Sequence, residues 1–262
     1  MTATFFEALK TQKRVVWALM LRETKTLFGK HKLGYLWAVI NGAFQIGVFW
    51  AIREVGGFQP PHGMSTPAFL LGGFVPFFIF REAVNGGLNA VGGNKALLGY
   101  PQVFPLDILV ARTLLQGAMQ TVVFVLLFLL ALGMGQQMTI VNIASILTAF
   151  SAALLLGFGT GALCSALNLM WVVTGQLVPM ILRVLFFTSG LFFAVVDLPS
   201  RARDILFYNP LSHIIVISRG AFVPDYGARF ISLPYLFGFI LVMLAAGLLL
   251  ERYSRHYLDR AL

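Results

Sequence analysis

Charged residues are missing from one very long part of this chain. Between Arg112 and Arg183, about seventy consecutive residues include no Asp, Glu, Lys or Arg. As one continuous helix this stretch would exceed about 100 Å at about 1.5 Å per residue, which is more than three bilayer cores. Every element of a water-soluble fold must turn some face toward solvent, so the stretch excludes that class. The sequence therefore predicts an integral membrane protein.

Cysteine and histidine are also scarce. Cys164 is the only cysteine, which excludes an intrachain disulfide. The four histidines are far apart in the sequence and lack the spacing of metal ligands. Together with the sparse acids, this scatter argues against a membrane-embedded lipid-modifying enzyme. We therefore expect no catalytic residue, no metal site and no cofactor on this chain.

Carboxylates at membrane depth and phosphate-binding loops are absent as well. No Asp or Glu lies between Asp107 and Asp197, whereas ion-coupled carriers usually bury a carboxylate at that depth. A phosphate-binding loop ends in Gly-Lys followed by Ser or Thr, but Gly29-Lys30 is followed by His31. Ion coupling is therefore disfavoured, and the chain is not expected to bind ATP by that route.

Long apolar segments are abundant in this chain. Hydrophobic residues make up 58% of its 262 positions, and the mean hydropathy is +0.84. Six apolar spans are predicted, with loops too short to hold a soluble domain. They cover about residues 34–52, 68–84, 108–132, 140–163 (with a possible extension to 170), 177–196 and 233–250. The predicted fold is thus all-α, one membrane domain over residues 1–262 with six transmembrane helices.

Positive charge is concentrated at the start of the chain. The net charge is +9, and seven of the nineteen Lys and Arg residues fall within the first 33 positions. Basic residues before a first span are typical of a cytoplasmic flank. This interpretation of the positive charge is favoured over nucleic-acid binding. Six crossings place both termini on one side, so both are expected in the cytoplasm of a multi-pass membrane protein.

Residues 1–33 also have an amphipathic pattern. Val16 and Met20 fall on one helical face with other apolar residues, and basic residues occupy the opposite face. We expect an interfacial helix in the cytoplasmic headgroup layer, in contact with membrane lipids, although a solvated helix on a soluble tail stays open. Its candidate residues at the cytoplasmic entrance are Trp17, Arg22, Lys25, Lys30 and Lys32.

Two breaks between spans are unusual. Residues 85–106 are rich in glycine and proline but contain enough leucine for a short helix. Residues 197–232 contain apolar stretches too short to cross, interrupted by Pro199, Pro210 and Pro224. Such stretches predict a re-entrant helical hairpin between spans five and six. The hairpin has four arginines on the presumed outer side, contrary to the usual charge rule.

Arginines near span ends are the candidates for binding chemistry. Arg183 is the one cation well inside a predicted span, so it either faces a polar cavity or extends to the interface. Arg53 and Arg81, at span ends, carry the same ambiguity. Together with Arg219, they offer guanidinium groups that match carboxylates and phosphates.

Four motifs, in order along the chain, resemble ABC-2-type exporters. The sequence is most similar to the capsular-polysaccharide permeases of Gram-negative bacteria. The motifs are Leu21–Trp37, Phe74–Phe80, Leu98–Asp107 with Ala111-Arg112, and Tyr208–His213 with Ser218-Arg219. The resemblance covers nearly the whole chain, and the ordered set is more specific than any one motif.

The resemblance implies a homodimer that works with two ATP-binding cassette subunits, which bind ATP and Mg²⁺. The cargo would be a lipid-linked acidic polysaccharide, moved from cytoplasm to periplasm through a channel at the dimer interface. Periplasmic and outer-membrane export proteins are further expected partners. Export of O-antigen or teichoic acid stays open, as does the alternative of an ATP-independent carrier or channel.

The resemblance also assigns roles to residues. Residues 85–106 would be the cytoplasmic coupling segment, and residues 197–232 would cap the periplasmic exit. The coupling candidates are Leu88, Asn94, Lys95, Leu97, Leu98 and Tyr100. The candidates for the substrate path are Arg53, Arg81, Arg183, Arg219, Tyr35, Trp37 and Phe186.

Overall fold

The computed structural model of the chain describes residues 2–28, 34–57, 61–94, 97, 99 and 103–258, and within them all regular structure is helical. The longer helices are α1 (Thr2–Phe28), α2 (Gly34–Val55), α3 (Thr66–Leu88), α5 (Pro105–Gly133), α6 (Ile143–Met170), α7 (Thr174–Thr188) and α10 (Leu233–Leu258). The shorter ones are η1 (Pro61–Gly63), η2 (Gly92–Asn94), η3 (Val195–Asp197), α8 (Ser200–Phe207) and α9 (Pro210–Arg219).

Helix α3 forms the centre of the bundle. It packs against α5, α6 and α9, and nearly all of its side chains are buried. Its sequence has an apolar residue or glycine at almost every position between Ala68 and Phe80, which suits a helix surrounded by other helices. Pro76 lies inside α3, and the helix continues on both sides of it.

Helix α6 contacts its neighbours through glycines on two sides. A Cβ atom on Gly87 of α3 would lie 2.6 Å from the Cα of Gly161, so only glycine permits this approach of the two helices. On another side, a Cβ on Gly247 of α10 would lie 2.4 Å from the carbonyl oxygen of Gly159. The close packing of α6 on α3 and α10 therefore depends on its glycines.

Four helices in the described part are long and apolar enough to cross a membrane: α3, α5, α6 and residues 233–256 of α10. They coincide with predicted spans two, three, four and six, and α6 does extend to Met170. The predicted first and fifth spans are also helices, α2 with 22 residues and α7 with 15.

The boundary predicted for the fifth span is wrong. The apolar run continues to Val196, but α7 ends at Thr188. Gly190 has a φ of +87°, a left-handed conformation that turns the chain and favours glycine. Residues 189–194 follow as a buried, irregular loop between α7 and η3. Hydropathy alone does not register this break, because the residues after it remain apolar.

The predicted hairpin segment contains two short helices, α8 and α9. Every residue of α9 from Leu211 to Arg219 is buried, and the helix packs against α3 and α6. At its base, the Nε2 atom of His213 donates to the Phe207 carbonyl at 2.8 Å, and its Nδ1 accepts from the Ser232 N–H at 3.3 Å. The two ring nitrogens thus connect the end of α8 to the residue that precedes α10.

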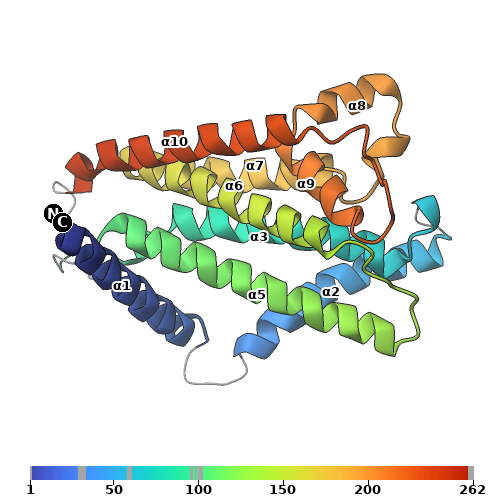
Figure 1. Cartoon of the computed structure of the whole chain (residues 1–262), viewed down its shortest axis with the longest axis horizontal. Helices are drawn as coiled ribbons and strands as arrows, with labels where there is room; N and C mark the ends of the chain where they lie inside the picture. Colours follow the sequence, from blue (N-terminus) through green and yellow to red (C-terminus); the bar gives the residue numbers. More distant parts are fainter. Residues whose placement is uncertain are drawn as a thin grey trace.

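The two ends of the bundle are formed by different elements. Helix α1 begins, and α10 ends, at one end, whereas α8 and η1 lie at the other (Figure 1). The apolar face of α1 packs on α5, where Leu19 is buried with Ile108 and Leu109. The side chain of Trp17 is 61% exposed.

Candidate functional site

A cavity of about 570 Å³ lies between α2, α3 and α7 and brings together three residues predicted for the substrate path. Arg81, Arg183 and Phe186 all line it. The remaining lining comes from the same three helices: Gln45, Phe77, Glu82, Asn85, Pro179, Leu182 and Phe187. The volume lies in the range of sites that bind small ligands.

The cavity has a net positive charge. The guanidinium of Arg81 binds the carboxylate of Glu82, with Nη2 and Oε1 2.8 Å apart, and its Cζ lies 4.6 Å from the Phe78 ring centroid. Arg183 has no ion pair among the residues that the structure describes. Two arginines and one glutamate leave one positive charge, which is available through Arg183. Arg183 lines the cavity, and its side chain is exposed.

An aromatic cluster adjoins the cavity. The Phe186 ring contacts Phe74 and Phe77, with centroids 5.8 and 5.4 Å apart, and Phe192 packs on Phe49 at 4.8 Å. Phe186 is therefore packed inside the bundle and does not face lipid with all of its surface. The cluster joins α2, α3 and α7 to the loop that follows α7.

Arg53 and Arg219 belong to a second region, here called the arginine hub, with Phe69 at its centre. Arg219 is fully buried and donates to the carbonyls of Phe69, Leu191 and Phe193 at 3.3, 2.9 and 3.2 Å. Arg53 donates to the Phe192 carbonyl at 3.2 Å. The Cζ atoms of Arg219 and Arg53 lie 3.6 and 4.6 Å from the Phe69 ring centroid.

The hub explains how the irregular loop after α7 can be buried. Backbone carbonyls that leave a helix in an apolar environment need another donor. The two arginines supply donors to three consecutive residues of that loop. Gly72 and Gly73 make room for Arg219, because a Cβ on Gly73 would lie 2.9 Å from its Nη2. In this conformation a substrate could reach Arg219 only after a rearrangement.

The predicted path residues therefore divide into two groups. Phe69 and Arg81 are twelve positions apart on α3, which corresponds to about 18 Å along the helix axis. The cavity lies toward the end where α3 leads into η2, and the hub lies toward α8 and α9. Tyr35 and Trp37 are in α2, but their side chains lie outside what the structure describes.

Where α1 packs on the start of α5, sequence reasoning missed a polar network. Glu23 of α1 forms an ion pair with Arg112 of α5 at 2.7 Å, and Arg22 donates to Asn94 Oδ1 at 2.9 Å. Gln12 also donates to the carboxylate of Asp107. The signal was present as a cluster of charges before two apolar spans, but their pairing depends on the docking of α1 on α5.

The coupling candidates are only partly described. Leu88 is buried, the side chain of Asn94 is buried at the network, and Leu97 packs against the cluster formed by α1 and α5. Lys95, Leu98 and Tyr100 lie outside the described residues, as do Lys30 and Lys32 of the predicted entrance. Arg22 is joined to Asn94, while Lys25 is exposed.

Comparison with known proteins gives strong matches over nearly the whole chain. The chain is 34% identical to the polysialic acid transport protein KpsM of Escherichia coli over 243 residues, which is 93% of this chain and 94% of KpsM. It is 26% identical to the capsule polysaccharide export inner-membrane proteins BexB of Haemophilus influenzae and CtrC of Neisseria meningitidis. These matches cover 95% of this chain and 94% of BexB, and 96% of both this chain and CtrC. A scan against family models gave no match. On the strength of these relatives, the chain belongs to the family of capsule-polysaccharide export inner-membrane proteins, which are ABC-2-type permeases.

Proposed function

We propose that this chain is the membrane-spanning permease subunit of an ATP-driven exporter of lipid-linked acidic capsular polysaccharide. Its family supports polysaccharide transport at the inner membrane. We choose an acidic cargo because Arg183, which has no ion pair among the described residues, lines a cavity next to aromatic rings. A guanidinium binds a sugar carboxylate, and an aromatic face packs on a sugar ring.

We further propose six crossings with both termini in the cytoplasm. Helix α2 would add a crossing of about 33 Å, and α7 a shorter one of about 23 Å, at about 1.5 Å per residue. The irregular loop after α7, satisfied by the hub, would complete that crossing, and the α8–α9 hairpin would then be re-entrant. The common position of the start of α1 and the end of α10 supports this topology (Figure 1), as does the basic start of the chain.

In this proposal the work comes from a separate ATP-binding subunit that contacts residues 85–106, and two copies of the chain form the channel. Gly92 is well placed to test the contact, because a side chain there would meet nothing within 4 Å. Gly133, at the opposite end of α5, is an equally open control. A Gly92→Cys variant should cross-link to cysteines introduced on the ATP-binding subunit, and Gly133→Cys should not. Equal cross-linking at both positions would refute the assignment.

Arg183 gives the direct test of the proposed cargo. In a strain that lacks the gene, Arg183→Glu should lower surface polymer at least about tenfold and leave polymer in the cytoplasm, because it reverses the free charge of the cavity. Arg183→Lys should retain much of the export. Arg201→Glu, an exposed substitution on α8 outside the cavity, is the matched control. Normal export by Arg183→Glu would overturn the role of the cavity.

The same strain separates the alternatives. If O-antigen or teichoic acid accumulates in place of capsule polysaccharide, the assignment of the cargo changes, but the assignment to this class of transporter does not. Uphill transport by the purified chain alone, in vesicles without any ATPase, would instead support the carrier.

A further inference from the structure

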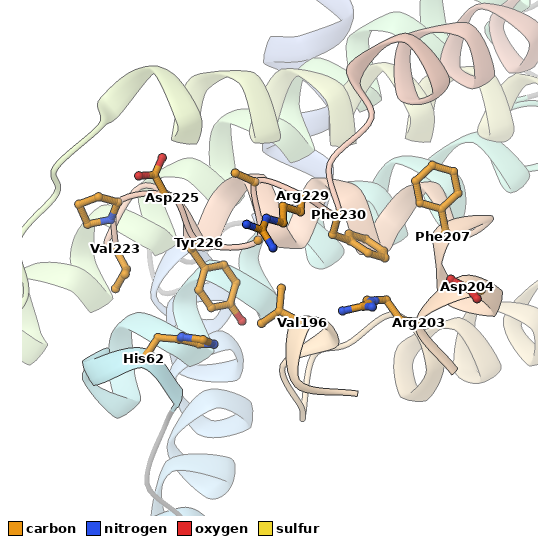
Figure 2. Close-up of a pocket in the computed structure, with 13 residues that line it drawn as sticks. His62, Val196, Arg203, Asp204, Phe207, Val223, Asp225, Tyr226, Arg229 and Phe230 are labelled. Carbon is orange, nitrogen blue, oxygen red and sulfur yellow. The ribbon is translucent and has the colours of Figure 1, made fainter. Parts of the chain in front are cut away.

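A second and larger cavity, of about 660 Å³, lies at the end of the bundle formed by the hairpin. Four segments build it: η1 with His62, η3 with Val196, helix α8 with Arg203, and the loop between α9 and α10 with Tyr226 and Arg229 (Figure 2). It shares no lining residue with the cavity that contains Arg183.

The charges around this hairpin cavity are arranged asymmetrically. Figure 2 shows the guanidinium groups of Arg203 and Arg229 turned toward its centre, while the carboxylates of Asp204 and Asp225 lie at its edge. Within the described part of the chain, neither arginine forms an ion pair. His62 is occupied by Asp197, with Nε2 and Oδ1 3.1 Å apart. Two unpaired cations on one concave surface favour an anionic ligand.

Tyr226 adds a buried hydroxyl group whose neighbour is the guanidinium of Arg219. Its side chain is only 4% exposed, and its hydroxyl makes no hydrogen bond of ordinary length and angle to the described residues. Figure 2 shows this hydroxyl directed toward the space between His62 and Val196. Burial raises the pKa of Tyr226 and outweighs the opposing charge of Arg219, so the hydroxyl stays protonated and can donate.

The backbone around the cavity is strained. His62 and Asp225 are the two residues other than glycine with positive φ in the described part of the chain, at 61° and 55°. Both line this cavity. Such conformations cost free energy and persist where the surroundings fix them, which is frequent at ligand sites.

We propose that this hairpin cavity is a binding site for a carboxylated sugar unit, held by Arg203, Arg229 and the hydroxyl of Tyr226. The inference rests on the proposed function, and it places a specific contact for the polymer at the end of the bundle away from the ATP-binding subunit. The guanidinium groups bind the carboxylate, and the tyrosine donates to a ring or hydroxyl oxygen.

The size and chemistry of the cavity favour a sugar over other anions. Its volume fits one or two sugar rings and is far larger than a lone phosphate needs. The ring of Tyr226 and the partly buried Phe207 provide apolar surface beside the cations. A folded protein partner would need a broad contact surface, whereas this site is concave and formed by four short segments.

The test measures binding to the purified full-length chain in nanodiscs of zwitterionic lipid. The probe is a trimer of galacturonic acid, detected by saturation-transfer NMR and titrated for affinity. We expect Arg203→Gln with Arg229→Gln to weaken binding at least about tenfold, and Tyr226→Phe to weaken it about threefold. Arg201→Gln, an exposed neighbour on α8 that does not line the cavity, should bind like the unchanged chain.

Three probes decide what the site recognises. A neutral maltotriose should bind at least about tenfold more weakly than the uronate trimer. Equal binding of maltotriose, of inorganic phosphate or of a triglutamate peptide would overturn the assignment to a carboxylated sugar. Unchanged affinity in the double arginine variant would overturn the site itself. Both arginines are exposed, so their replacement by glutamine should leave the fold intact, which a matching near-ultraviolet circular dichroism spectrum checks.

This experiment can fail independently of the proposed function. Binding that depends on Arg203 and Arg229 would stand even if deletion of the gene left export unchanged, which would refute only the exporter. Conversely, normal affinity in the double variant together with loss of export on deletion would refute only the hairpin cavity.

Discussion

The two ends of the helical bundle hold their buried arginines in different ways. Near the hairpin, Arg219 is fully buried, donates to backbone carbonyls and packs on an aromatic ring. At the other end, where α1 packs on the start of α5, Arg112 binds a carboxylate, Glu23, and both side chains retain slight exposure, 17% and 10%. The first arrangement satisfies a break in a helix, whereas the second joins two helices by opposite charges. Their responses to substitution should therefore differ.

The largest expected effect is at the arginine hub. Arg219→Met removes donors from three carbonyls in an apolar environment and should destabilise the fold by about 3–5 kcal/mol. Arg219→Lys should not restore stability, since one ammonium cannot reach carbonyls on α3 and on both sides of the loop. Thermal unfolding of the purified protein in detergent measures both. A melting temperature like that of the exposed control Arg201→Met would contradict this role.

Next in size is the ion pair between α1 and α5. Glu23→Ala leaves Arg112 without its carboxylate and should cost about 2–3 kcal/mol, less than the full buried-pair value because water reaches both groups. Exchange of the two charges, Glu23→Arg with Arg112→Glu, should recover part of the loss. The hub has no comparable rescue, since its acceptors are backbone atoms. If the charge-exchanged variant is no more stable than the less stable single variant, the ion pair and the hub do not differ in this way.

A smaller effect is expected at the glycine that accommodates Arg219. Gly73→Ala places a methyl group 2.9 Å from Nη2 and should cost about 1–2 kcal/mol by displacing the guanidinium. Gly47→Ala is the matched control on α2, where an added Cβ meets nothing within 4 Å. Comparison of the two melting temperatures separates crowding from the general effect of alanine in a helix. Equal shifts would show that the space beside Arg219 is not critical.

The smallest effect is expected for the exposed pair between His62 and Asp197. Their side chains are 46% and 51% exposed, so Asp197→Asn should change stability by less than about 0.5 kcal/mol. The same melting experiment, repeated at low and high salt, checks this. A loss as large as that of Glu23→Ala would mean that exposure is a poor guide to the value of these pairs.

Much of the helical layout could be predicted from hydropathy, because a bilayer requires long apolar helices. Spans two, three, four and six were found near their predicted limits. The end of α7 could not be predicted, since Leu191–Val196 is as apolar as the helix before it. What stops the helix there is the turn at Gly190 and the donors of Arg219, which come from a helix about 30 positions later.

The candidate site could be predicted only as a set of residue types. Arg81, Arg183 and Phe186 were selected from their places in spans, and the structure joins them in one cavity. The division of the arginines into cavity and hub could not be foreseen, because it depends on which face of α3 each neighbouring helix covers. The hairpin cavity escaped prediction for the same reason, as its four segments meet only in the folded chain.

The glycine contacts of α6 bear on how a transport cycle could move this protein. With α3 against Gly161 and α10 against Gly159, the three helices are in backbone contact, and sliding or rotation between them would cause immediate collisions. Helices α3, α6 and α10 should therefore move as one rigid body. Helices α2 and α7 contact the rest of the bundle less extensively, so they are the helices that can move relative to this rigid body. The cavity that they line can then change volume while α3, α6 and α10 keep their arrangement.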